Sequence, residues 1–101
     1  MAKHIIETVT FKLNAGVDRA DFIASAETMN DWVATRPGFV HRRLSCGPDG
    51  TWIEHIEWDT MENAKAAAAQ IMSAPNNAGF LMAIDEGSVQ MSHSELEVGV
   101  N

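Results

Sequence analysis

Residues 49–58 carry the pattern that most constrains the fold of this chain: a turn followed by a strand with one strongly apolar face. Side chains alternate between the two faces of a strand, so one face is predicted to hold Trp52, Glu54, Ile56 and Trp58. A carboxylate among tryptophans is costly to bury unless it is paired. The segment is therefore typical of a pocket wall. A core strand, with Trp58 packed on a helix, is the alternative that the sequence leaves open.

The rest of the chain has the periodicities of three further strands and two main helices. Asp18 is a predicted N-cap of the first helix, and Asp59 with Glu62 resembles a capping box for the second. Pro75 suits the first turn of a short further helix that brings Phe80 onto the core. The predicted elements are strand 5–13, helix 19–35, strand 39–46, turn 47–50, strand 52–58, a helix that begins after 59 and reaches 71, and strand 88–98.

This β-α-β-β-α-β order predicts an α+β, ferredoxin-like domain that spans residues 1–101. Right-handed crossovers place both helices on one side of a four-stranded antiparallel sheet. The other side of the sheet is then bare, and a second copy of the chain is the simplest cover for it. We therefore expect a homodimer in which two sheets form a dimeric α/β barrel and enclose a cavity. If the tryptophan face is the bare one, the partner covers it.

Charge and composition exclude several partner classes. The chain has 7 basic and 14 acidic residues, a net charge of −7, which disfavours nucleic acid and anionic membranes as partners. No stretch is long and apolar enough for a membrane span. The first residues lead directly into the first predicted strand, so no signal peptide is expected. The single cysteine, Cys46, suits a reducing compartment, and we expect a cytoplasmic protein.

Several short motifs resemble the antibiotic biosynthesis monooxygenase family, which has the dimeric α/β-barrel fold. The resemblance covers most of the chain. The family includes small oxygenases that use no metal or flavin, haem degraders, quinol oxidases and many members whose activity is not known. The opening Phe-Lys-Leu-x-x-Gly-Val pattern also looks like the stress-responsive barrel proteins. The motifs are Asp31-Trp32-Val33, Pro37-Gly38-Phe39, Asp49-Gly50-Thr51, Trp58-Asp59, residues 11–16 and residues 88–91.

The resemblance also implies a site, from which this chain departs in part. Family oxygenases place an Asn and, four residues later, a Trp in the pocket; Trp58 matches the Trp, but Glu54 stands at the Asn position. An amide can donate to a developing enolate, whereas an ionised carboxylate repels it. The family tyrosine corresponds to Ala64. Haem degraders carry a His after the second helix, where this chain has Asn76, Asn77 and Phe80, so no haem or other cofactor is expected.

The remaining candidates lie on other strands. Glu7 is a mid-strand carboxylate beside Val9, predicted to be a structural acid paired with Arg42 or Arg43, or less readily a catalytic one. His93 is a candidate base at a pocket mouth or a structural hydrogen-bonder. The four histidines lack the short spacing of a metal motif, so no metal is expected. The predicted catalytic residues are Glu54, Trp58 and His93, and the predicted substrate contacts are Glu7, Val9, Trp52, Ile56 and Phe80.

These features support three hypotheses. The first is a cofactor-independent monooxygenase of a small apolar or aromatic substrate, in a pocket between sheet and helices at the dimer barrel. There Glu54 or His93 removes a proton, and the carbanion reacts with oxygen between Trp52 and Trp58. The second is a non-enzymatic dimer with a stress role or a hydrophobic metabolite as ligand, which the missing Asn and Tyr favour. The third is an isomerase or lyase that uses only the acid-base chemistry of this pocket.

Overall fold

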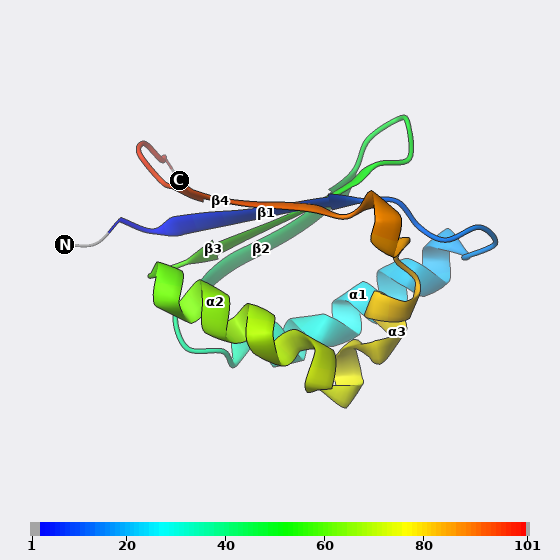
Figure 1. Ribbon diagram of the computed structural model, residues 1–101, viewed down its shortest axis with the longest axis horizontal. Coiled ribbons are helices and arrows are strands. Elements are labelled where there is room, and N and C mark those ends of the chain that lie inside the picture. The colour runs from blue at the N-terminus through cyan, green and yellow to red at the C-terminus, as the bar shows by residue number, and fades with distance from the viewer. Residues whose placement is uncertain (1–2, 101) are drawn as a thin grey trace.

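The computed structural model, which describes residues 3–100, has one layer of strands and one layer of helices (Figure 1). Short 3-10 turns occupy residues 71–73, 75–77 and 86–88. The elements are β1 (Ile5–Phe11), α1 (Arg19–Ala34), β2 (Phe39–Cys46), β3 (Trp52–Trp58), α2 (Met61–Gln70), α3 (Ala78–Met82) and β4 (Gln90–Glu95).

The four strands form one antiparallel sheet in the order β2-β3-β1-β4. All three helices lie on the same side of this sheet, and Figure 1 shows its other side uncovered. The structure thus confirms the predicted α+β, ferredoxin-like plan. No helix within residues 3–100 is long and apolar enough to cross a membrane.

The two main helices begin at capping residues, one of which was predicted. Asp18 accepts a hydrogen bond from the backbone N–H of Asp21 (3.1 Å), as expected for an N-cap. The predicted cap of α2, Asp59, is wrong by one residue. Thr60 has the extended backbone of an N-cap and accepts from the N–H of Asn63 (3.1 Å). Asp59 instead accepts from the Asn63 side-chain amide.

Two strands are shorter than their alternation predicted. β1 ends at Phe11, because the chain beyond it turns toward Ile84, with which Leu13 forms an isolated bridge. β4 begins at Gln90 rather than at residue 88, because Asp85 caps a turn by accepting from the N–H of Gly87 (3.1 Å). The alternation of apolar residues thus continues past the hydrogen-bonded ladder at both places.

The helical layer covers the tryptophan face of β3, so this face is not the bare one. Trp58 is 1% exposed and packs with Val33 of α1 and with Ala64 and Ala67 of α2. The Ala-rich helix can approach the sheet closely because its side chains are small. The condition under which a second copy would cover the tryptophans is therefore not met, and the alternative of a core strand holds for Trp58. A cavity between two sheets would be lined by other residues.

The bare face of the sheet carries the alternate residues of each strand. It is mixed in character, with an exposed isoleucine, Ile53, beside hydroxyl and charged side chains. Its members are Ile6, Thr8 and Thr10 of β1, His41, Arg43 and Ser45 of β2, Ile53, His55 and Glu57 of β3, and Gln90, Ser92 and Ser94 of β4.

Candidate functional site

A cavity of about 510 Å³ lies between the sheet and the helical layer. Its floor is the helix-facing side of β1 and β3, and its roof comes from the helices and the turns that follow them. The lining residues are Glu7, Val9, Phe11, Glu54, Ile56 and Met91 from the strands, Met29, Ala68, Ile71, Met72, Phe80, Leu81 and Ile84 from the helical layer and the segment after it, and Glu86 and Val89 before β4.

The lining is apolar apart from three carboxylates. Glu7 and Glu54 are buried, with 7% and 4% of their surface exposed, whereas Glu86 is exposed. The two buried carboxylates come from adjacent strands, since Glu54 is the register partner of Val9, two residues after Glu7. Both therefore point into the helix-covered side of the sheet. Burial of this kind is unusual for an acid and raises its proton affinity.

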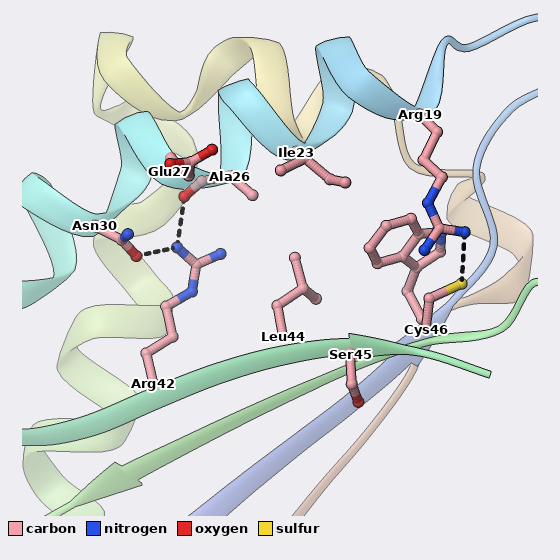
Figure 2. Close-up of a pocket in the computed structure, with 10 residues that line it drawn as sticks. Arg19, Ile23, Ala26, Glu27, Asn30, Arg42, Leu44, Ser45 and Cys46 are labelled. Atoms are coloured by element: carbon pink, nitrogen blue, oxygen red, sulfur yellow. Dashed lines mark hydrogen bonds between the residues drawn. The ribbon is translucent and has the colours of Figure 1, made fainter.

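Glu54 is held by Arg42 of β2 in an ion pair buried on both sides. The Nε of Arg42 donates to both carboxylate oxygens (3.1 Å each), and Nη2 donates to Oε1 (2.8 Å). Figure 2 shows the same guanidinium reaching α1, where Nη1 donates to the Ala26 carbonyl (2.7 Å) and to Asn30 Oδ1 (2.8 Å). Burial raises the pKa of the Glu54 carboxyl, and the contacts from Arg42 oppose that rise.

The predicted pairing of Glu7 with Arg42 or Arg43 is wrong. The sheet order places β3 between β1 and β2. Arg42 on β2 is therefore adjacent to Glu54 on β3, and Glu7 on β1 is one strand further away. Arg43 projects from the bare face, on the opposite side of the sheet from Glu7. A carboxylate two strands away could not be assigned a partner without knowing which strands are neighbours.

Glu7 instead accepts a hydrogen bond from the indole Nε1 of Trp58 (3.0 Å). Its register partner on β4 is His93, whose Nε2 lies 3.9 Å from Glu7 Oε1. That nitrogen is buried and has no hydrogen-bond partner among the described residues. Burial raises the pKa of the Glu7 carboxyl, and the Trp58 hydrogen bond and the nearby His93 lower it by less. Glu7 is thus a buried acid with one neutral donor.

The structure gathers most of the predicted site residues, but not all, around this cavity. Glu7, Val9, Glu54, Ile56 and Phe80 line it. Three others do not: Trp58 lies in the core and reaches the cavity only through Glu7, His93 lies beside Glu7, and Trp52 faces a different hollow.

The lining residues that sequence analysis did not assign to a site come mainly from the helical layer and the segment before β4. Met29, Ala68 and Ile71 have the spacing of a buried helical stripe, and a stripe has the same pattern whether it meets a strand or an empty volume. Val89 and Met91 share a predicted strand face with His93, and this was the available signal for them.

A second, more polar hollow of about 440 Å³ lies between α1 and β2 (Figure 2). The Arg19 guanidinium lies 5.2 Å from the centre of the Trp52 ring, and its Nη1 is 3.9 Å from Cys46 Sγ. Arg42 separates this hollow from the apolar cavity, since it lines the one and its partner Glu54 lines the other. Within residues 3–100, no group of three or more His, Cys, Asp or Glu side chains is placed to hold a metal ion.

Comparison with known proteins identifies the fold. No family model matches the sequence, and no curated protein matches it by sequence similarity. Solved structures do match: SnoaB, a cofactor-independent oxygenase from Streptomyces nogalater, is 17% identical with a TM-score of 0.68 and covers 99% of this chain and 97% of its own. A candidate antibiotic biosynthesis monooxygenase from Bordetella bronchiseptica is 16% identical, with a TM-score of 0.75 and coverages of 95% and 99%.

A monooxygenase from the ActVA-Orf6 gene of Streptomyces coelicolor, solved with nanaomycin D, is 14% identical with a TM-score of 0.64 and coverages of 98% and 92%. The chain therefore has the fold of the antibiotic biosynthesis monooxygenases, as the short motifs suggested. At these identities the likeness establishes the fold alone.

The raised pKa of Glu7 makes stability depend on pH. The folded protein holds this proton more tightly than the unfolded chain, whose Glu titrates near its ordinary value of 4.5. Between these two pKa values unfolding releases a proton, so a rise in pH lowers the free energy of unfolding. Glu7→Gln cannot titrate, and its amide oxygen still accepts from Trp58.

Urea unfolding of Glu7→Gln should therefore show a smaller loss of stability with rising pH than the wild-type protein shows. Some pH dependence remains because Glu54 is also shifted upward. Identical pH profiles for the two proteins would contradict a raised pKa at Glu7.

Proposed function

We propose that this protein, which shares its fold with a cofactor-independent oxygenase, oxidises a small apolar or aromatic substrate with molecular oxygen in the cavity between sheet and helices. The observation that carries the proposal is Glu7: a buried carboxylate with a raised pKa in the lining of an apolar cavity. A general base works best when its pKa lies near the working pH. An ordinary surface glutamate is too weak a base for this task.

The reaction begins with removal of a proton from an acidified C–H group of the substrate. The C–H bond breaks, the proton goes to the Glu7 carboxylate, and the electron pair stays on carbon. The carbanion gives one electron to O₂, and the substrate radical and superoxide then combine to form a C–O bond. Glu7 returns its proton to the peroxide. The hydroperoxide of a CH₂ group then loses water, so one oxygen atom remains as a carbonyl and the other leaves as water.

The surroundings of Glu7 suit this proton transfer. The Trp58 indole donates to Oε1 and holds the carboxylate in place, so Trp58 is a positioning residue rather than a substrate contact. Once protonated, Glu7 is neutral and can donate a hydrogen bond to the substrate anion. The Nε2 of His93 lies 3.9 Å from Glu7 Oε1, beyond hydrogen-bond distance, so His93 is a neighbour of the base rather than its hydrogen-bond partner. The total charge of the site stays constant during the transfer.

Glu54 is less suited to be the base, because Arg42 occupies its carboxylate oxygens through three contacts. It contributes a fixed ion pair at the cavity wall. The buried apolar residues of the lining, such as Phe80 and Ile56, shield the reacting carbon from water. Exclusion of water strengthens the electrostatic interactions inside the site and protects a carbanion from protonation by solvent.

Oxygen uptake with a panel of anthrones and quinols tests the proposal. Loss of a general base lowers rates by about 10²–10⁴-fold, so Glu7→Gln is expected to lower turnover by that factor with an intact fold. Glu62→Gln, which changes an exposed carboxylate on α2, is the matched control and should leave turnover unchanged. Equal turnover by Glu7→Gln and wild type on every active substrate would contradict the role of Glu7.

One observation favours a binding protein without turnover as the second candidate. Among the described lining residues, no side chain offers a neutral N–H or O–H donor to a developing oxyanion, which leaves only protonated Glu7 for this role. A binder predicts thermal stabilisation by apolar ligands with no oxygen uptake. An isomerase or lyase, which needs the same base, would instead form product equally well without oxygen.

We also propose a homodimer that forms through the bare face of the sheet, as the sequence predicted. The bare face, rather than the tryptophan face, is the surface that a second copy would cover. Arg43 and His41 on β2 and Glu57 on β3 give this face charges of both signs, so two copies related by a twofold axis can place unlike charges opposite each other.

Sedimentation velocity tests the interface. Ile53 on the bare face and Ile23 on α1 are equally exposed, at 38% each, and so form a matched pair. We expect Ile53→Arg to weaken the dimer by at least about tenfold, because a buried interface position loses more than about 1.4 kcal/mol when a charge is placed there. Ile23→Arg should sediment like wild type. A wild-type protein that stays monomeric at micromolar concentration would contradict the dimer.

A further inference from the structure

We propose that the apolar cavity selects its ligand by charge: it accepts neutral hydroxyl- or amide-bearing aromatics and aromatic ammonium ions, and it rejects aromatic carboxylates. This inference rests on the proposed function only in placing the ligand in that cavity. It names the substrate class through the charged residues of the lining, whether or not the bound molecule is turned over.

Every charged side chain in the described lining is acidic. The three are Glu7, Glu54 and Glu86, and no Lys, Arg or His side chain within residues 3–100 lines the cavity. The nearest fixed cation, Arg42, faces the other hollow and is already bonded to Glu54, Asn30 and the Ala26 carbonyl. A ligand in this cavity therefore meets carboxylates and no lysine or arginine that is free to pair with it.

The three acids do not contribute equally. The charge of Glu54 is offset by a guanidinium at 2.8 to 3.1 Å, and Glu86 is exposed at the rim, where salt screens it. Glu7 has only a neutral indole donor and a histidine nitrogen 3.9 Å away. Its charge is the least compensated, so it is expected to dominate the selection.

The charge of a ligand then determines its expected affinity for this cavity. A carboxylate in this cavity loses its hydration and gains no cation, and it is repelled by Glu7 across a medium of low dielectric constant. A hydroxyl or amide N–H donates to the free lone pairs of the Glu7 carboxylate. An ammonium group forms a charge-assisted hydrogen bond there, of the stronger kind.

The ion pair between Glu54 and Arg42 allows the charge selection to be reversed by one substitution. In Glu54→Gln the Arg42 guanidinium keeps its charge but loses the carboxylate that neutralises it. A buried guanidinium without its partner binds a carboxylate well, because the fork of N–H donors matches the two oxygens. Glu54→Gln should therefore reverse the selection, whereas Glu7→Gln should only weaken it.

Isothermal titration with three probes of one ring system tests this: naphthamide, naphthoate and naphthylmethylammonium. In wild type, naphthamide should bind at least about tenfold more tightly than naphthoate, equivalent to about 1.4 kcal/mol. Glu7→Gln should remove most of that ratio, and Glu54→Gln should favour naphthoate. Glu62→Gln makes the same change in net charge on the exposed side of α2 and should keep the wild-type ratio.

The outcomes are separable. Equal affinity of wild type for naphthamide and naphthoate, or an equal shift in Glu62→Gln and Glu7→Gln, would overturn charge selection by the lining. Failure of all three probes to bind would overturn both this inference and the proposed ligand cavity. Selective binding without oxygen uptake would remove the oxygenase and support charge selection. If Glu54→Gln does not fold, the Glu7→Gln ratio still decides the question.

Discussion

Two carboxylates, Glu7 and Glu54, are buried on the side of the sheet that the helices cover, and the chemistry of the molecule follows from how each is compensated. Glu54 has a guanidinium held by three contacts, whereas Glu7 has an indole N–H. Burial of an acid opposes folding unless a partner offsets it. Burial of Glu7 therefore destabilises the folded state, and packing elsewhere must offset that loss. Such a destabilising residue is more typical of functional sites than of purely structural ones.

The order of the strands in the sheet explains why both carboxylates line the same cavity. Because β1 and β3 are central and antiparallel, their helix-facing residues form a continuous floor, and the two carboxylates face the same volume. α2 stays close to one end of the floor, where Ala64 and Ala67 pack on Trp58. At the other end Phe11, Phe22 and Trp52 form a second core cluster. The cavity lies between the two clusters, where Ala68, Ile71 and Phe80 leave an open volume above Glu7 and Glu54. The strand residues of core and pocket nevertheless have the same sequence pattern.

Because core and pocket residues share one sequence pattern, the sequence predicted the elements but not the position of the cavity. Alternation and helical spacing identified every main element and the ferredoxin-like order, because these depend on local periodicity. They grouped Trp52, Glu54, Ile56 and Trp58 on one face but could not say which face the helices cover, and the tryptophans proved to be on the covered one. The predicted partner of Glu7 was wrong because it depends on the order of the strands in the sheet. The extent of β1 and β4 was wrong because apolar alternation continues beyond the hydrogen-bonded ladder.

The most direct test of this account is the titration of the Glu7 side-chain carboxyl, followed by its ¹³C resonance, with Glu7→Gln to assign the signal. We expect a midpoint above the ordinary value of 4.5, which rises further when an apolar ligand displaces water from the cavity. A midpoint at or below the ordinary value, unmoved by ligand, would show a solvated or fully compensated carboxylate and contradict a buried base in an apolar cavity.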